Sequence, residues 1–173
     1  VLSHEAVKFD VTEENSTEES GVTVVAVKLG NYAQKGIIKI SKTGEVFASV
    51  TAADGVYRPV YTVQGLAGAT YEIKAAADIY TPDGTLRCSA GEVVDTVTTG
   101  ADDTVESKPL YLGKYEITEM KAPDGMVVNK DSHTAELVYA DQEIEITETA
   151  ASFCNDRQKA RISLSKVLEQ NKQ

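Results

Sequence analysis

Asn31-Tyr-Ala-Gln-Lys-Gly-Ile-Ile-Lys-Ile-Ser-Lys42 recurs later in the chain as Asn155-Asp-Arg-Gln-Lys-Ala-Arg-Ile-Ser-Leu-Ser-Lys166. The match extends upstream, because Ser3-His4-Glu5-Ala6 resembles Ser132-His133-Thr134-Ala135, with a longer loop in the first copy. A period of this length corresponds to one domain and not to a solenoid unit. The repeat therefore predicts a tandem array. Residues 1–34 are expected to be the C-terminal hairpin of a preceding repeat, 35–158 a complete domain, and 159–173 the first strand of a following repeat.

Strand signals dominate the complete domain. Val, Ile, Thr and Tyr alternate with polar residues, and turn residues interrupt the runs, with Asp54-Gly55 the best hairpin signal. Only the Ala-rich stretch 74–79 fits a helical turn, and no long segment keeps a period of 3.6 residues. Many short strands at this spacing predict an all-β fold, a β-sandwich. The expected strands are 6–11, 22–29, 36–42 (ended by Thr43-Gly44), 45–50, 57–63, 71–74, 92–98, 114–120, 135–139, 144–147 and 151–155.

The net charge of −10 argues against several classes of partner. Acidic residues crowd the start of the chain, and such a surface repels phosphate backbones, so nucleic acid is not an expected partner. No apolar stretch approaches the roughly 20 residues that a membrane span needs. Two cysteines, Cys88 and Cys154, are too few for a disulfide framework, and we favour free thiols, although a pair stays possible. His4 and His133 are interpreted as repeat-related surface residues, so neither a metal site nor a cofactor is expected.

Strand parity places three polar residues at the ends of apolar faces, because side chains alternate between the two faces of a strand. They are Lys42, Glu119 and Asn155. Two of them recur in phase, as Lys166 and Asn31. Each alone fits a strand-end residue that reaches solvent, but the three together favour a chemical role. Their apolar neighbours on the same faces are Ile38 and Ile40, Tyr115 and Ile117, and Ala151 and Phe153.

Burial gives these three residues a specific chemistry. A Lys in an apolar core is driven toward its neutral, nucleophilic amine, and a buried Glu toward its protonated form. Protonated Glu119 would donate to the carbonyl of Asn155, neutral Lys42 would attack that carbon, and Glu119 would relay protons to the departing ammonia. The predicted product is a Lys42–Asn155 isopeptide bond. Lys39, on the alternate polar face, and Asn129, in a turn-rich stretch, are the rejected competitors.

The chain resembles the Cna B-type repeat of Gram-positive surface adhesins and pilins, also described as the SpaA-like, prealbumin-like domain. The resemblance covers roughly residues 36 to 158. It rests on Gly36-Ile-Ile-Lys-Ile-Ser-Lys42, Leu66-Ala-Gly-Ala-Thr-Tyr-Glu-Ile73, Leu112-Gly-Lys-Tyr-Glu-Ile-Thr-Glu119 with Ala122-Pro-Asp-Gly125, and Phe153-Cys-Asn155.

The resemblance implies an immunoglobulin-like sandwich of reversed topology and an intramolecular isopeptide bond at Lys42, Glu119 and Asn155. It also implies an extracellular, cell-wall-anchored protein whose partners are neighbouring repeats of the same polypeptide. The chain departs from the family pattern in two places. Residues 45–64 form an extra stretch, and Met126 follows the Pro-Asp-Gly turn where an aromatic residue is common.

A structural spacer or stalk module, self-crosslinked once and not a turnover enzyme, is the leading functional hypothesis. The alternative is a ligand-binding adhesin head that uses the 45–64 insertion to contact a host extracellular protein. Tyr57, Arg58 and Tyr61 are residue types that favour interfaces, although packing along an edge strand is the simpler explanation for them. A hydrolase is a weak third hypothesis, because no Gly-x-Ser-x-Gly elbow or phosphate-binding Gly loop is present.

Overall fold

The computed structural model describes residues 6, 8–27 and 30–167. All regular elements among these residues are strands, so the predicted all-β fold is confirmed. The described residues contain no helix that could cross a membrane. The strands are β1 (Ser16–Glu19), β2 (Val22–Val25), β3 (Lys35–Ala53), β4 (Val56–Gly65), β5 (Thr70–Ala75), β6 (Ile79–Tyr80), β7 (Leu86–Cys88), β8 (Val93–Thr98), β9 (Thr104–Glu106), β10 (Leu110–Tyr111), β11 (Gly113–Lys121), β12 (His133–Leu137) and β13 (Ile146–Asn155).

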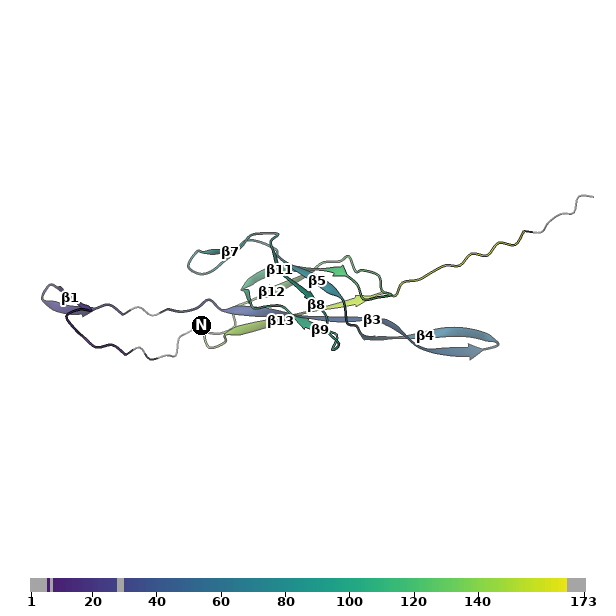
Figure 1. Ribbon diagram of the computed structural model, residues 1–173, viewed down its shortest axis with the longest axis horizontal. Helices are drawn as coiled ribbons and strands as arrows, with labels where there is room; N and C mark the ends of the chain where they lie inside the picture. Colours follow the sequence, from purple (N-terminus) through teal and green to yellow (C-terminus); the bar gives the residue numbers. More distant parts are fainter. Residues whose placement is uncertain (1–5, 7, 28–29, 168–173) are drawn as a thin grey trace, which may run out of the picture.

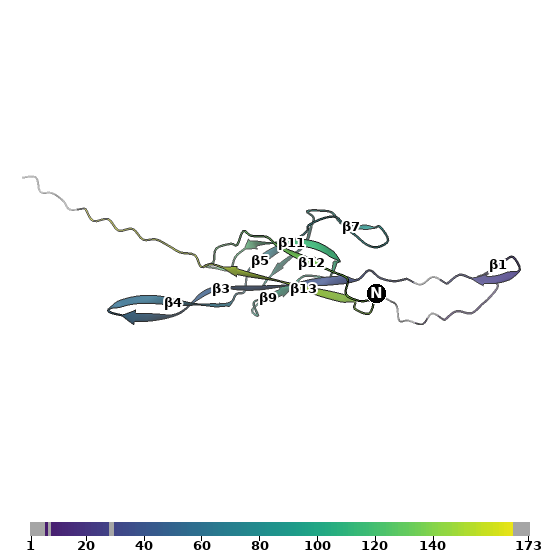
Figure 2. The ribbon, with the colours of Figure 1, turned by 180° about the vertical axis from the view of Figure 1, so that it is seen from behind.

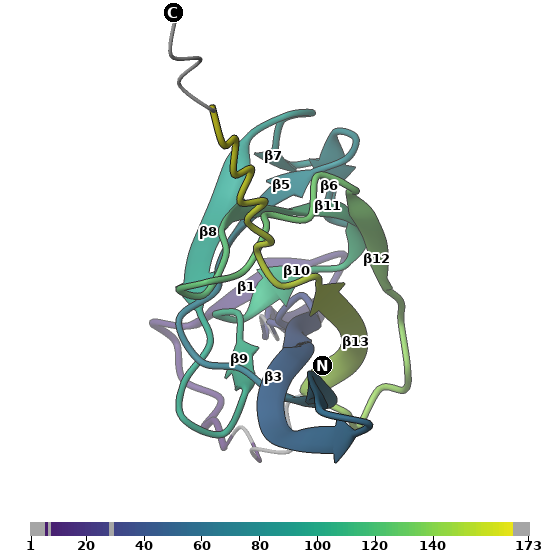
Figure 3. The ribbon, with the colours of Figure 1, turned by 90° about the vertical axis from the view of Figure 1, so that its right-hand side faces the viewer.

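Two sheets form the sandwich, which is seen from one end in Figure 3. One sheet has the order β10-β3-β13, with β4 and β9 also paired to β3, and the other has the order β12-β11-β5-β8. Within both sheets, β3 and β13 pair in parallel and the remaining pairs are antiparallel. The first and last strands of the domain are therefore neighbours that run in the same direction.

Alternation along the strands builds the core between the two sheets. Every second residue of β3 from Gly36 to Gly44 is buried, and β5, β11 and β13 show the same period of two. Removing these apolar side chains from water is the main stabilising contribution to folding, at about 25 cal/mol per Å². The core residues on the four strands are Ile38, Ile40, Tyr71, Ile73, Ala75, Tyr115, Ile117, Ala151 and Phe153.

The long strand β3 corrects one prediction and bears out another. It does not end at Thr43-Gly44 but continues to Ala53, with Gly44 opposite Gln64 of β4. Gly44 is needed for close approach, since a Cβ there would lie 2.6 Å from Leu66 Cδ1 and 3.0 Å from the Asn155 carbonyl oxygen. The hairpin at Asp54-Gly55 is confirmed, and both residues have positive φ (51° and 74°), as a type I′ turn requires.

Several expected elements differ from the observed ones. The described residues of 6–11 form no strand, and β1 lies in a segment expected to be an acidic loop, joined to β2 by a Ser20-Gly21 turn with positive φ. Residues 74–79 make no helical turn, because the chain bends at 76–77 and enters β6. The predicted strands 144–147 and 151–155 are one strand, β13. The sequence does not predict short β6, β7, β9 and β10. β9 and β10 pair with the distant strand β3, and β6 and β7 form a local hairpin of only two or three residues on each side.

Two segments extend from opposite ends of the sandwich in Figures 1 and 2. The β1–β2 hairpin lies beyond the end where β3 begins, and residues 158–167 leave the other end without pairing as a strand. The β3–β4 hairpin projects from that second end too. Ser3, His4, Glu5 and Leu29 of the repeat lie outside the described residues. The assignment of the two flanks to neighbouring repeats stays a prediction.

Candidate functional site: a buried Lys-Glu-Asn cluster

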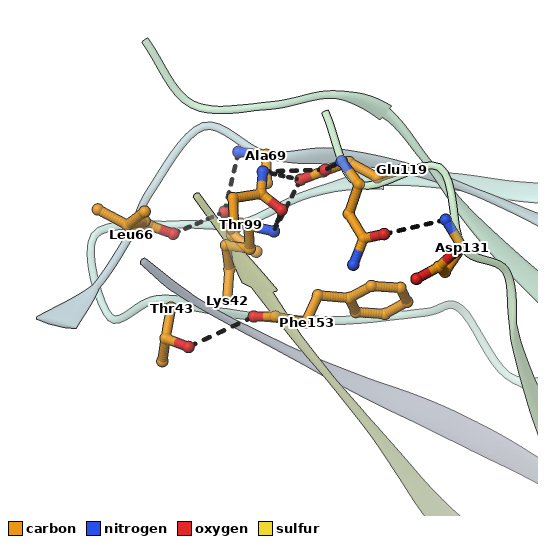
Figure 4. A network of polar contacts seen from close by, with 10 residues as sticks. Lys42, Thr43, Leu66, Ala69, Thr99, Glu119, Asp131 and Phe153 are labelled. Atoms are coloured by element: carbon orange, nitrogen blue, oxygen red, sulfur yellow. Dashed lines mark hydrogen bonds and ion pairs between the residues drawn. The ribbon is translucent and has the colours of Figure 1, made fainter. Parts of the chain in front are cut away.

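Three strands bring Lys42, Glu119 and Asn155 together inside the sandwich. Figure 4 labels Lys42 and Glu119 within this network of polar contacts. Lys42 on β3 is the Cα partner of Phe153 on the parallel strand β13, and Asn155 follows two residues later on the same face. Glu119 comes from β11 in the facing sheet. The nucleophile and the amide therefore lie on neighbouring strands of one sheet, and the carboxyl group reaches them from across the core.

Short contacts join the three side chains. Lys42 Nζ lies 2.9 Å from Glu119 Oε1 and donates a hydrogen bond to Asn155 Oδ1. Asn155 Nδ2 donates to both carboxylate oxygens of Glu119, at 2.9 Å each. The three residues are 0%, 5% and 2% exposed, so water does not compete for these bonds. One oxygen, Oε1, thus touches both the amine of Lys42 and the amide nitrogen of Asn155.

The contact of Glu119 differs from the one expected from the sequence. The sequence predicts a hydrogen bond from the carboxyl group to the carbonyl oxygen of Asn155, but the carboxyl group binds the amide nitrogen, because Lys42 occupies the oxygen. Glu119 Oε2 also accepts a hydrogen bond of 2.6 Å from the backbone N–H of Asn129. The carboxyl group is therefore held from two sides and faces the group that would leave.

Aromatic rings enclose the cluster, and sequence reasoning does not identify this role. Lys42 Nζ lies 6.0 Å from the ring centroids of both Tyr71 and Phe153, which pack 4.6 Å apart. Tyr71 is the Cα partner of Glu119 on β5, and its buried hydroxyl has no hydrogen bond of standard geometry. Burial, and then the nearby Glu119 charge, raise the pKa of Tyr71. The alternation of Tyr71 with Ile73 is the signal that could have placed this ring beside Glu119.

Backbone bonds at the same level hold the strand ends in register. Lys42 N–H donates to the Asp103 carbonyl at 2.9 Å, and the Lys42 carbonyl accepts from Leu66 N–H at 2.9 Å. The Thr99 hydroxyl donates to the Leu66 carbonyl at 3.0 Å and accepts from Ala69 N–H at 3.1 Å (Figure 4). These bonds satisfy backbone groups that would otherwise be buried without partners, and they fix where the Lys42 side chain begins.

The two competing residues lie outside the cluster. Lys39 is on the other face of β3, half-exposed, with Glu148 at 3.0 Å and Glu106 at 3.5 Å. The side chain of Asn129 turns away from the cluster, since its Oδ1 accepts from Asp131 N–H at 2.9 Å. Only its backbone N–H reaches Glu119.

The other predicted site residues lie on the β3–β4 hairpin, outside the cluster. Tyr57 and Arg58 are exposed, whereas Tyr61 is half-buried beneath the guanidinium of Arg157, 3.6 Å above its ring. Cys88 and Cys154 are free thiols, the first half-buried and the second exposed. The described part of the chain holds no group of three or more acidic, His or Cys side chains arranged for a metal ion.

The family model of the SpaA prealbumin-like fold domain matches residues 60–150, which is more than half of the chain. The chain belongs to the SpaA prealbumin-like fold family. Glu119 lies within the matched residues, and Lys42 and Asn155 lie outside them. The predicted resemblance and the prealbumin-like sandwich are thereby confirmed, whereas the crosslink between Lys42 and Asn155 stays a prediction.

Three solved pilin structures are weakly similar to this SpaA-family chain. GBS52, the minor pilin in Streptococcus agalactiae, is 14% identical with a TM-score of 0.47, over 78% of this chain and 49% of that one. The major pilin SpaD from Corynebacterium diphtheriae is 21% identical with a TM-score of 0.45, over 72% and 30%. The fimbrial protein FimP from Actonomyces oris is 18% identical with a TM-score of 0.45, over 73% and 30%. The chain spans about half the length of the first pilin, and no curated protein matches it.

Proposed function

We propose that this chain is a spacer module from a tandem array in an extracellular, cell-wall-anchored adhesin or pilin, crosslinked by its own Lys42–Asn155 isopeptide bond. One observation carries the proposal: Glu119 Oε1 lies 2.9 Å from both Lys42 Nζ and Asn155 Nδ2, in a pocket without access to solvent. The neighbouring repeats of the same polypeptide are its first partners.

The geometry supports a balanced acyl transfer. Glu119 takes one proton from the Lys42 ammonium, which leaves a neutral amine and a neutral acid in a site where charges are poorly solvated. The amine attacks Cγ of Asn155, Glu119 gives its proton to Nδ2, and the Cγ–Nδ2 bond breaks to release ammonia. Glu119 then removes the surplus proton from Nζ of the new amide. The products are one isopeptide bond, one ammonia and a protonated Glu119.

Proximity replaces an external enzyme in this reaction. Nucleophile, amide and proton carrier are held at hydrogen-bond distance by three strands, so no bimolecular encounter is needed. The reaction happens once per chain, and turnover of an added substrate is not expected. A bond between adjacent parallel strands at the two ends of the domain would carry tension directly from β3 to β13.

Intact mass tests the proposal. The purified chain should weigh one ammonia less than its sequence, and fragmentation should yield a branched peptide that joins Lys42 to Asn155. Lys42→Ala and Glu119→Ala should each have the full mass expected from sequence, whereas Lys39→Ala should still lose ammonia. A wild-type mass equal to the sequence mass would remove the crosslink from the proposal and leave a spacer held by its core alone.

A second function is favoured by the exposed aromatic residues of the β3–β4 hairpin. Tyr57 is 75% and Phe47 56% exposed on one face of the hairpin, and Arg58 is exposed on the other. Such residues fit a surface that binds a host extracellular protein. Saturable binding to purified matrix proteins, lost in Tyr57→Ala, would support this adhesin role.

A further inference from the structure

The β3–β4 hairpin has one apolar face, and a bulge is what creates it. Cα pairing is Phe47 with Tyr61, then Ser49 with Val60, so the register shifts by one residue at Ala48. Side chains of directly opposed residues share a face, and without the bulge Phe47 would share its face with Ser49. The apolar hairpin face comprises Phe47, Val50, Ala52, Tyr57, Pro59, Tyr61 and Val63. The opposite hairpin face carries Ser49, Thr51, Arg58 and Thr62 between valines.

The apolar hairpin face is exposed on a ribbon of two strands. Phe47, Val50, Tyr57 and Val63 are 56%, 52%, 75% and 63% exposed. An isolated two-stranded hairpin is marginally stable in water, and contiguous exposed apolar residues mark interaction surfaces. The apolar hairpin face therefore has the character of an interaction surface.

The chain leaves the domain across the same face. Arg157 forms an ion pair with Glu45 at the hairpin base and lies over the Tyr61 ring at 3.6 Å. Both partners belong to the side of the apolar hairpin face, since Glu45 pairs with Val63. Backbone bonds from Val127 N–H to Asp156 and from Gln158 N–H to Gly125 hold this exit in place. The Arg157 side chain thus ties the junction to the base of the apolar hairpin face, while the backbone of Gln158 is bonded to the 125–127 loop.

The beginning of the domain shows how short the junction is. Gln34 is buried, its Nε2 donates to the carbonyls of Asp141 and Ile144, and its Oε1 accepts from Ala140 N–H at 3.1 Å. The domain thus begins at Gln34. Gln158 holds the same position in the repeat, so the following module should begin there.

The length of the hairpin, compared with the length of the junction after Asn155, shows what lies beside the hairpin. Asn155 is level with Gly44, and β3 continues past that point from Glu45 to Ala53, which is roughly 30 Å at about 3.3 Å per residue. From Asn155 the chain has only Asp156, Arg157 and Gln158 before the following module, which is at most about 10 Å. The hairpin extends past the end of β13 on the side where residues 158–167 leave (Figures 1 and 2). It must therefore overlap the following module along the axis.

We infer that the apolar hairpin face docks against the N-terminal end of the following module of the same polypeptide. This inference rests on the tandem-array part of the proposed function and not on the crosslink. In this domain, that end carries a depression of about 170 Å³ whose lining includes Tyr80, Pro82, Leu112 and Tyr139 and also the incoming chain at Ala33 and Gln34. Tyr80 and Tyr139 are 57% and 60% exposed. A docked hairpin would add a second connection between modules beside the main chain and hold consecutive modules in one orientation.

A two-module protein that keeps the junction residues Asp156, Arg157 and Gln158 tests the docking. It contains residues 1–158 followed directly by residues 35–173, with Cys88→Ser and Cys154→Ser in each copy, and the natural chain with the same two changes is the one-module reference. Ala52→Cys in the first copy places a thiol on the apolar hairpin face, and Ala53→Cys is the matched control on the opposite face. Alkylation of each thiol by iodoacetamide is followed by mass.

The expected result is a face-specific protection. In the two-module protein the thiol at 52 should react about tenfold more slowly than in the one-module chain, as follows if the docked state is about ten times more populated than the open one. The thiol at 53 should react at the same rate in both. Arg157→Ala should restore the reactivity at 52, and Arg58→Ala, on the opposite face, should not.

Four outcomes would overturn the inference. The first three are unchanged reactivity of the thiol at 52, equal slowing of the thiols at 52 and 53, and a second copy that does not fold. The fourth is protection at 52 already in a one-module chain whose molar mass has doubled, because the face would then be covered by another copy of the chain. The intact mass of the same samples reports the crosslink separately. Full sequence mass together with protection at 52 would refute the crosslink and support the docking. Loss of ammonia without protection at 52 would support the crosslink and refute the docking.

Discussion

The two halves of β3 belong to one strand and behave as two different structures. From Lys35 to Gly44 the strand lies between β13 and the short strands β9 and β10, and its alternate residues are buried. From Glu45 to Ala53 it pairs with β4, and most of its residues are exposed. The change occurs at Gly44, level with Asn155, where β13 ends. Both halves are hydrogen-bonded to neighbouring strands, so burial is what distinguishes a strand of the sandwich from a projecting arm.

Loss of the crosslink should have the largest effect on stability. Lys42→Ala removes the proposed bond, whose loop would span the 113 positions between the two residues. Closing a loop of about 100 residues stabilises by roughly 4–5 kcal/mol if the crosslink acts as a disulfide does. The melting temperature should fall by roughly 10–20 °C. Lys39→Ala on the exposed face of the same half-strand is the control, since exposed ion pairs contribute little.

A small change in melting temperature for Lys42→Ala, equal to that of Lys39→Ala, would contradict this prediction. Calorimetry with intact mass on the same samples separates the two possible reasons. If the wild-type protein has lost ammonia but is no more stable than Lys42→Ala, the bond forms, and the unfolded chain is already so compact that the bond constrains it little. An unchanged wild-type mass would show that no bond forms.

Gly44→Ala should have the next largest effect, because it changes the boundary between the two halves. The added Cβ would meet Leu66 Cδ1 at 2.6 Å and the Asn155 carbonyl oxygen at 3.0 Å. Overpacking of this kind costs about 1–3 kcal/mol, and the displaced end of β13 should slow ammonia loss. Thermal denaturation and a time course of intact mass after refolding measure both effects. Normal kinetics would show that Asn155 does not depend on this contact.

Gly55→Ala gives the matched change in the projecting half. Gly55 has φ of 74°, and a methyl group added there would meet nothing within 4 Å. An L-residue in this conformation is strained by roughly 1–2 kcal/mol, but the strain falls on the hairpin tip. The melting temperature of the domain and its ammonia loss should therefore stay close to wild type, and thermal denaturation with intact mass measures both.

Removing the projecting half should affect the sandwich less than either change in the body. The variant joins Glu45 to Val63, which are Cα partners, through Asn-Gly in place of residues 46–62. Most of the removed side chains are exposed, so the melting temperature should change by only a few degrees, and ammonia should still be lost. Calorimetry and intact mass are the measurements. If the shortened variant failed to fold, the hairpin would be required for folding of the sandwich, and the two halves of β3 would not behave as two different structures.

The sequence predicts the buried face of β3 and the Asp54-Gly55 hairpin but misplaces the boundary between the two halves of the strand, for a physical reason. Burial imposes a period of two, so the parity of Ile38, Ile40 and Lys42 predicts which side chain enters the core, and the same reasoning places Glu119 and Asn155. The second half faces solvent on both sides, where no such constraint acts. Gly44 therefore resembles a turn residue in the sequence, although its role is close approach to Leu66 and Asn155.

Tertiary contacts account for the remaining differences. Whether Glu119 meets the oxygen or the nitrogen of Asn155 depends on the reach of Lys42 across the strand, which parity does not encode. The bulge at Ala48 shifts the register of the hairpin, and it is visible only in the pairing with β4. The burial of Gln34 depends on a loop more than a hundred residues away in sequence.

The smallest predicted effect concerns a second projecting element, β6–β7, whose turn is held by polar contacts instead of a strand pair in the core. Asp83 accepts from the Thr81 hydroxyl at 2.6 Å and from Thr85 N–H at 3.2 Å. The Thr81 bond foremost, with smaller contributions from Thr85 and Arg87, lowers the pKa of Asp83 to about 2. A carboxyl group whose pKa is lowered by folding stabilises the fold above its unfolded pKa, about 3.9, and this is lost as pH falls through about 2.

Acidification from pH 4 to pH 2 should therefore open the β6–β7 turn while the sandwich stays folded. The protection factor of the Thr85 amide, which compares its exchange rate with the intrinsic rate at the same pH, should fall over that range, because its N–H loses the acceptor on Asp83, and amides of β3 between Lys35 and Gly44 should stay protected. Asp83→Asn is the control, since it keeps an oxygen acceptor that does not titrate, and its Thr85 exchange should lack this pH step. If Thr85 opens in wild type with a midpoint near 4, Asp83 titrates as an unfolded carboxyl does. The β6–β7 turn would then gain no stability from the Asp83 hydrogen bonds and would resemble the exposed second half of β3.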